Sequence, residues 1–147
     1  MSADRLYPVR PFLASSVAVL RDGKVLLAAR ARPPMARVFS LPGGLVEPGE
    51  TLAEAALREL AEEVGVEARI EGFLAPVEIL ERDEDGRVRH HYVVLAHVAR
   101  WIAGEPAPGP EALEVRWVSP GEADALPCTP GLADILRLAF AFDGAAR

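Results

Sequence analysis

The chain has 147 residues, of which 50% are apolar and 26% charged, with a formal net charge of -6 at pH 7. This length favours one domain spanning residues 1–147, large enough for a hydrophobic core. The net negative charge makes binding to nucleic acid or to anionic membranes an unfavoured function. If the protein binds a phosphate, local arginines, backbone N–H groups or metal ions must hold it.

The beginning of the chain predicts a β-hairpin followed by an irregular segment. Two apolar runs in residues 15–31 are separated by Asp22-Gly23, a dipeptide typical of tight hairpin turns. Residues 32–50 are rich in proline and glycine, so they are not expected to form regular structure over any length.

After a helix at residues 51–64, the pattern returns to strands. Residues 67–80 and 88–101 predict two strands joined by a turn, and residues 114–119 predict a short one. A closing helix over residues 130–142 has apolar side chains at the spacing of one helical face: Leu132, Ile135, Leu136 and Ala139. The hairpin connections favour a mixed sheet with helices packed on it, an α/β fold of the α+β type, over a parallel βαβ fold.

The helix at residues 51–64 has both ends marked in its own sequence. Thr51 and Glu54 form a capping box, in which each side chain satisfies a free backbone N–H of the other residue. Gly65 stands where a helix commonly ends with a left-handed residue. A stripe of apolar residues is expected to pack on the sheet: Ala53, Ala56, Leu57, Leu60 and Val64.

Three glutamates form a second cluster on this helix. Glu59, Glu62 and Glu63 lie about 120° from the apolar stripe, with Glu63 nearest the core. Their mutual repulsion grows as water is removed, and Arg58 offsets part of it. Carboxylate oxygens are the ligands that Mg²⁺ and Mn²⁺ prefer, but the helix alone is equally consistent with a solvated acidic face. The glycine-rich sequence "LPGGLVEPGE" just before it, whose backbone is unhindered, favours the metal site.

A single cysteine, Cys128, excludes an intrachain disulfide and favours a reducing compartment. It lies in the proline-rich sequence "LPCTPG", where a packing role is more typical than a nucleophilic one. The sequence contains neither an apolar run of membrane-spanning length nor a signal-peptide pattern. We therefore expect a soluble protein of the cytoplasm.

Residues Gly44 to Val66 resemble the complete Nudix box, G-x5-E-x7-R-E-U-x-E-E-x-G-U, in which U is aliphatic. None of the specified positions departs from this pattern, which is matched by Gly44, Glu50, Arg58, Glu59, Leu60, Glu62, Glu63, Gly65 and Val66. The resemblance implies an α/β/α sandwich around a mixed sheet. It also implies an enzyme that hydrolyses nucleoside diphosphates linked to another moiety, often as a homodimer.

Roles for individual residues follow from the same resemblance. Glu59, Glu62 and Glu63 are expected to bind Mg²⁺ or Mn²⁺ together with the carbonyl of Gly43 or Gly44. Arg58 is expected to orient the glutamates by ion pairing. Glu50 is expected to support the loop or a water-bound metal, and it is also a candidate for binding the substrate. The general base is left open between Glu62 and an acid of the later loop, Glu111 or Glu114, with Glu111 preferred, although two solvated loop acids explain Glu111 and Glu114 equally well.

Several residues outside the box are candidates for binding the substrate. Arg30, Arg32 and Arg37 lead towards the box and can receive phosphates, although ordinary surface charge explains them equally well. Phe39 can stack on a base, but a core position is the more typical role for it. His90 and His91 alternate along a strand, so at most one faces a pocket, and neither has the partners of a zinc site.

The stretches "RHHYVVLAHVARWIAGEP" and "LPCTPGL" are similar to Nudix proteins grouped with ADP-ribose pyrophosphatases. A proline that some ADP-ribose hydrolases carry after the box is absent, and Glu81 to Asp83 occupy its region. ADP-ribose or another sugar nucleotide is the favoured substrate, and a nucleoside triphosphate, cleaved to monophosphate and pyrophosphate, is the alternative. A nucleotide sensor without activity is disfavoured by the intact box, and an isoprenoid diphosphate isomerase by the position of Cys128.

Overall fold

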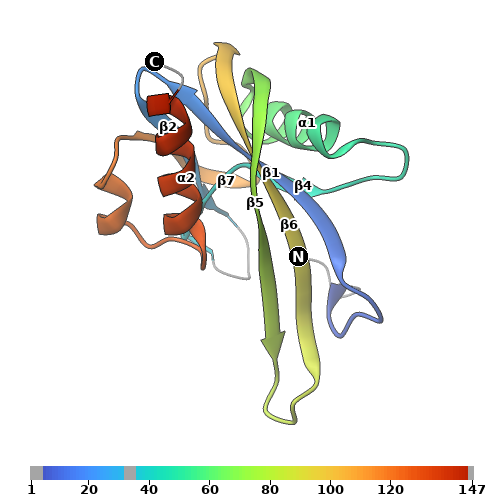
Figure 1. The fold of residues 1–147 in the computed structure, drawn as a ribbon. Coiled ribbons are helices and arrows are strands. Elements are labelled where there is room, and N and C mark those ends of the chain that lie inside the picture. Colours follow the sequence, from blue (N-terminus) through green and yellow to red (C-terminus); the bar gives the residue numbers. More distant parts are fainter. Residues whose placement is uncertain (1–4, 32–35, 146–147) are drawn as a thin grey trace.

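A computed structural model describes residues 5–31 and 36–145 of the chain. Within these residues seven strands form one mixed sheet, with a helix on each face (Figure 1), which confirms the expected fold class. The elements, in chain order, are β1 (Phe12–Arg21), β2 (Lys24–Arg30), β3 (Phe39–Ser40), β4 (Gly43–Leu45), α1 (Leu52–Val64), β5 (Glu67–Arg82), β6 (Val88–Ala103), β7 (Ala112–Val118), the 3₁₀ helix η2 (Glu122–Ala125) and α2 (Leu132–Ala145).

The predicted hairpin at the beginning of the chain is formed by β1 and β2. Asp22 and Gly23 both have positive φ, 51° and 77°, as a two-residue turn with the twist of a hairpin requires. The two strands pair only next to this turn and then separate. On its other edge β2 pairs with β7 along most of its length, while β1 runs parallel to β6 and so makes the sheet mixed.

The space left by this separation is filled by a segment that the sequence predicted to be irregular. Here the prediction is incomplete, because β3 pairs with β2 and β4 pairs with β1. The free edges of β1 and β2 carry backbone groups that need partners, and these short strands supply them. Gly43 permits the close approach, because a Cβ at this position would lie 2.5 Å from the carbonyl oxygen of Ser15.

Helix α1 has the predicted ends and covers one face of the sheet. The capping box between Thr51 and Glu54 is present, and Gly65 ends the helix with φ 74°. Leu60 and Val64 are buried against Val17 and other residues of one hydrophobic cluster. Of the other residues in the predicted apolar stripe, Ala56 is buried in this cluster and Leu57 packs against it, whereas Ala53 is only partly buried and the unpredicted Ala55 is buried instead.

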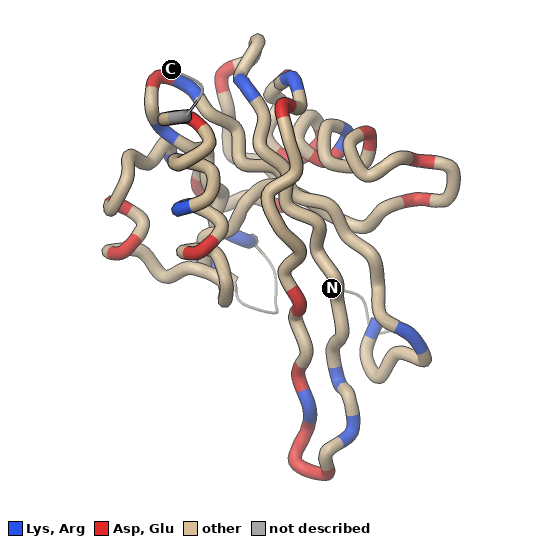
Figure 2. Tube along the Cα trace, viewed as in Figure 1, with Lys and Arg blue, Asp and Glu red and all other residues tan. Residues whose placement is uncertain are grey.

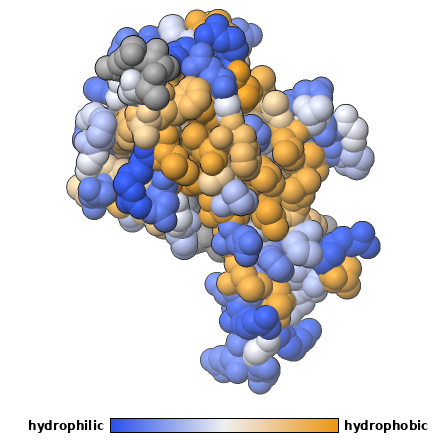
Figure 3. Space-filling view, viewed as in Figure 1, coloured by the Kyte–Doolittle hydropathy of each residue, from blue (hydrophilic) through white to orange (hydrophobic). Residues whose placement is uncertain are grey.

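Helix α2 covers the opposite face. All four residues of its predicted apolar stripe are buried. Leu132 and Leu136 pack in a second cluster with Ala18 and Leu20 of β1, which alternate with the residues that face α1. Figure 3 shows apolar side chains gathered where α2 meets β5. None of the described helices is both long and apolar enough to cross a membrane.

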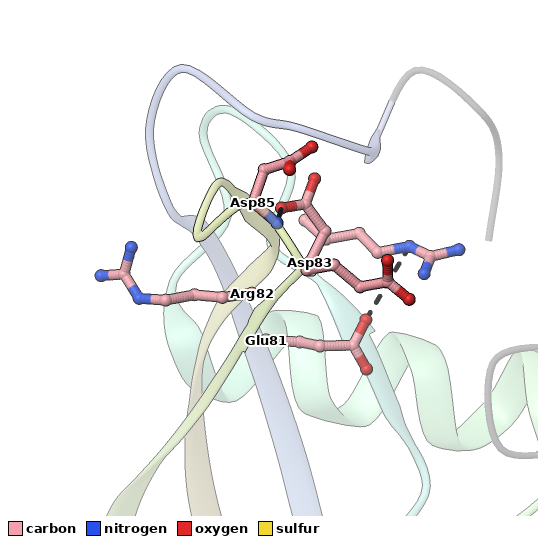
Figure 4. Close-up of a pocket in the computed structure, with 6 residues that line it drawn as sticks. Glu81, Arg82, Asp83 and Asp85 are labelled. Atoms are coloured by element: carbon pink, nitrogen blue, oxygen red, sulfur yellow. Dashed lines mark hydrogen bonds and ion pairs between the residues drawn. The ribbon is translucent and has the colours of Figure 1, made fainter.

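Strands β5 and β6 form a long hairpin that projects beyond the rest of the fold (Figure 1). Its end is acidic on the β5 side and basic on the β6 side (Figure 2). At the turn, the Asp83 carboxylate accepts a hydrogen bond from the backbone of Asp85 (Figure 4) and another from the backbone of Arg87. The N-terminal segment is bound to this end, since the backbone N–H of Tyr7 donates to Arg89.

Replacing Thr51 with Ala tests how far the capping box stabilises α1. The variant loses the acceptor for the Glu54 N–H, so its free energy of unfolding should fall by about 1 kcal/mol. Urea denaturation followed by circular dichroism measures this change. Thr51→Ser retains the hydroxyl and should stay close to the unmodified protein. If both variants lost the same free energy of unfolding, the stabilisation would come from the methyl group of Thr51 and not from its hydroxyl cap.

Candidate active site

A cavity of about 960 Å³ lies beside the place where β1 and β2 separate. Its lining includes Ser15 and Ser16 of β1, the glycines of β4 and the inner glutamates of α1. A second arm reaches the β5–β6 hairpin and the beginning of α2. Such a volume is typical of sites for small organic ligands.

A smaller hollow of about 500 Å³ lies at the tip of the hairpin (Figure 4). Every residue in its lining is charged: Glu81, Arg82, Asp83, Glu84, Asp85 and Arg89. It therefore lacks the apolar wall that usually buries an organic ligand, and the larger cavity is the candidate site.

Glu63 projects from α1 towards the core side, as its position on the helical wheel predicted. The backbone N–H of Gly43 donates to its Oε2 at 2.9 Å. The pKa of Glu63 is raised from its ordinary value of 4.5 to about 7, chiefly by burial; the charges of Glu59 and Glu111 also raise it, whereas the Gly43 hydrogen bond and Arg30 lower it. The protein thus holds an acid that is costly to ionise without a cation beside it.

Glu59 lies next to Glu63 and is held against the glycine strand. Its side chain is only 16% exposed. A Cβ on Gly44 would lie 2.4 Å from its carboxyl carbon, so only glycine leaves the carboxylate in this place. Burial raises the pKa of Glu59, while the adjacent Arg58 opposes the rise.

Arg58 connects the acidic residues of the helix and the loop. Its Nε and Nη2 donate to the two oxygens of Glu50 at 2.7 and 2.9 Å, a bidentate ion pair. Its Nη1 donates to Glu59 at 2.8 Å and to Glu62 at 3.2 Å, and Nη2 also reaches the Leu45 carbonyl. The pair with Arg58 lowers the pKa of Glu50, whose carboxylate also accepts from the Glu47 N–H and lies outside the cavity lining, so the structure does not bring it to the predicted substrate site.

Glu62 faces outward, with a side chain that is 61% exposed. In the part of the chain that the structure describes, no three acidic, histidine or cysteine side chains converge into a ready-made metal site. Glu62 would have to turn from Arg58 to join Glu59 and Glu63. The donors nevertheless fit a hard divalent cation, because all are oxygens and a side chain at Gly44 would fill the space in front of Glu59.

The two candidate acids of the later loop differ in position. Glu111 lines the cavity, and its charge contributes to the raised pKa values of Glu59 and Glu63. Glu114 lies on β7 and forms an ion pair with Arg116 at 2.6 Å. Geometry therefore favours Glu111 as the acid that can act beside the helix glutamates.

The predicted substrate residues are only partly brought together. Arg30 lines the cavity, whereas Arg37 is exposed in a turn with φ 68° and is not part of the lining. Phe39 is 4% exposed within the α2-side core, so it is a core residue and cannot offer its ring to a base. Arg32 lies outside the described residues.

Sequence reasoning missed the second arm of the cavity. Tyr92 and Val94 on β6 and Ile79 on β5 line it, together with Leu132 and Ile135 of α2. The alternation noted for His90 and His91 could have been extended to place residues 90, 92 and 94 on one face. It could not show that α2, which comes more than 30 residues later in the sequence, covers only part of that face and leaves the rest open to the cavity.

Comparisons with known proteins agree with this geometry. The NUDIX domain family profile matches residues 11–139. An ADP-ribose pyrophosphatase of Methanocaldococcus jannaschii is 34% identical over 113 residues, which span 77% of this chain and 64% of that protein. A CTP pyrophosphohydrolase of Escherichia coli is 36% identical over 126 residues, or 85% of this chain and 88% of that protein.

A solved structure gives the same result. The crystal structure of a MutT NUDIX hydrolase from Burkholderia pseudomallei superimposes with a TM-score of 0.75 and 29% identity, covering 88% of this chain and 98% of that one. The two chains thus share one fold, and the chain belongs to the Nudix hydrolase family.

Proposed function

We propose that the chain hydrolyses the diphosphate bond of a nucleoside diphosphate linked to another moiety, with ADP-ribose or a similar sugar nucleotide as substrate. The observation that carries this proposal is the pair of shielded carboxylates, Glu59 and Glu63, beside a cavity of about 960 Å³. The apolar arm of the cavity suits the ring of a base or a sugar. The proposal includes a cytoplasmic location, where nucleotide substrates are abundant, and a single domain spanning residues 1–147.

The site is proposed to hold Mg²⁺ or Mn²⁺. Glu59, Glu62 and Glu63 would bind the cation together with the carbonyl of Gly43 or Gly44. The raised pKa values of Glu59 and Glu63 support this, since a nearby cation would offset the cost of ionising them. When bound, such a cation lowers the pKa of a coordinated water and neutralises phosphate charge.

The chain's own residues then have separate roles. Arg58 holds Glu59 and Glu50 in fixed orientations, and Arg30, which lines the cavity, is placed to bind a phosphate oxygen. Glu111 accepts a proton from the attacking water while the oxygen of that water bonds to one phosphorus. The bridging oxygen leaves with the other phosphate, so two phosphorylated products form without a covalent enzyme intermediate.

A nucleoside triphosphate is the alternative substrate. The relative named CTP pyrophosphohydrolase is matched over 88% of its length, whereas the one named ADP-ribose pyrophosphatase is matched over 64%. Both kinds of substrate contain the same phosphoanhydride bond and differ in what lies beyond it. The proposed chemistry of the glutamates is therefore the same for both.

The proposed function is tested first by analysing products. Incubation with Mg²⁺ should convert ADP-ribose to AMP and ribose 5-phosphate, which mass spectrometry distinguishes. Release of a nucleoside monophosphate and pyrophosphate from triphosphates would instead support the alternative. Glu62→Gln should lower kcat by about a hundred-fold or more, whereas Glu114→Gln, outside the cavity, should not. Nucleotide binding without any cleavage would mean that the chain is a sensor.

Replacing Gly44 with Ala tests the placement of Glu59. The new Cβ would lie 2.4 Å from the Glu59 carboxyl carbon and displace the end of that flexible side chain. We expect Mg²⁺-dependent kcat/KM to fall about ten-fold or more, with little change in melting temperature. Gly144→Ala, where a Cβ meets nothing within 4 Å, is the matched control. Unchanged kcat/KM in Gly44→Ala would separate Glu59 from the metal site.

The raised pKa of Glu63 predicts a dependence of stability on pH. Because its pKa is about 7 when folded and 4.5 ordinarily, its contribution to stability is present below pH 4.5 and is lost as pH rises through 7. In metal-free buffer at pH 8, Glu63→Gln should therefore be more stable than the unmodified protein, by on the order of 3 kcal/mol. The difference should shrink towards pH 4.5.

The same two proteins can then be compared with Mg²⁺ added. The cation should raise the melting temperature of the unmodified protein at pH 8 and raise that of Glu63→Gln less, since binding stabilises the folded state. A stability difference that does not change between pH 4.5 and pH 8 would show that Glu63 is not shielded as described.

A further inference from the structure

The second arm of the cavity is a slot with apolar walls. Its floor comes from directly opposed residues of the β5–β6 hairpin, Val77 with Val94 and Ile79 with Tyr92, which therefore share one face of the sheet. Leu132 and Ile135 of α2 also line it. Ring systems are the ligands that such walls favour.

The next pair along the same face is polar. His90 lies opposite Glu81 and belongs to the cavity lining, yet it is only 9% exposed. Its Nδ1 lies 2.9 Å from Glu81 Oε1. The Arg89 guanidinium is farther from the same oxygen, at 3.9 Å (Figure 4). A polar pair thus closes the hairpin end of an apolar slot.

The hydrogen bond between this pair determines what it can offer to a ligand. Because a carboxylate only accepts, the proton of a neutral His90 ring lies on Nδ1, and Nε2 is left as an acceptor. The second oxygen of Glu81 is an acceptor as well. A ligand that reaches this end of the slot therefore meets acceptors and must itself donate.

We propose that the slot binds the nucleobase of the substrate, and that His90 and Glu81 select bases that carry an exocyclic amino group. The inference rests on the proposed function, because it assumes a substrate with a base. An amino group donates to the acceptors, whereas the carbonyl oxygen that replaces it in hypoxanthine or uracil meets them with a lone pair. Leaving the ring nitrogen of the buried His90 without a donor is costly, so the pair discriminates against oxo bases.

Binding of nucleoside monophosphates tests this selection without any turnover. AMP and IMP differ by an amino group in place of a carbonyl, and so do CMP and UMP. Isothermal titration calorimetry in metal-free buffer should show the amino member of at least one pair binding about ten-fold tighter or more. Glu81→Gln should reduce this ratio, because its amide can also donate. The variant should fold normally, since the Glu81 side chain is 57% exposed.

His90 is tested by two substitutions, because a buried residue can affect folding. His90→Phe removes both ring nitrogens and should abolish the preference, and His90→Gln, which keeps an acceptor, should retain part of it. The matched controls are His91→Phe, on the opposite face of β6, and Glu84→Gln, in the turn. Both controls should keep the ratio measured for the unmodified protein.

The outcomes separate this inference from the proposed function. Equal binding of both members in each pair, no binding of any of the four, or a ratio that persists in Glu81→Gln and His90→Phe would overturn the inference. Hydrolysis of ADP-ribose or a triphosphate would still support the function in each of these cases. Conversely, a preference that His90→Phe abolishes would support the slot even if no substrate were cleaved.

Discussion

The guanidinium of Arg58 holds three acidic side chains together, and the arrangement of the candidate site depends on it. Glu50 comes from the loop before α1, while Glu59 and Glu62 come from the helix itself. Without a cation among them these acids would repel one another at short range. The planar fork of arginine can bind both oxygens of Glu50 and still reach its neighbours, which a lysine could not do. The additional bond to the Leu45 carbonyl ties β4 to the same group.

A second constraint comes from β1, which changes partners along its length. Its first half lies between β4 and β6, and its last residues pair with β2. Ser15, in this first half, donates to the Leu52 carbonyl at the start of α1 and contacts His97 of β6. The site is thus built where a buried strand joins the helix, the glycine strand and the long hairpin. Its acids are positioned by regular structure, which limits their freedom to move.

Local patterns predicted much of this arrangement. The hairpin turn at Asp22-Gly23, the capping box at Thr51 and the stripe of α2 are short-range signals, and each is present in the structure. The clustering of Glu59, Glu62 and Glu63 was predicted for the same reason, since their spacing along one helix fixes their relative positions. Their expected role as metal ligands came from the resemblance to the Nudix box. Glu63 was expected to be the most shielded of them, and its raised pKa agrees.

Features that depend on distant segments could not be predicted in this way. The strands at residues 39–40 and 43–45 form because β1 and β2 separate, which no local pattern records. Glu111 reaches the helix glutamates through the pairing of β7 with β2, and Phe39 is withdrawn into the core by its packing with α2.

The parallel pairing of β1 with β6 also affects how the chain can fold. Contacts such as that between Ser15 and Leu95 join residues 80 positions apart, so closing this pair costs more chain entropy than forming a hairpin. On the ribosome β1 emerges long before its central partner has been synthesised. Its core residues are apolar on both faces, so the nascent chain carries an unprotected, aggregation-prone strand through most of its synthesis. The strand that organises the finished site therefore stays without its parallel partner until well after it has been synthesised.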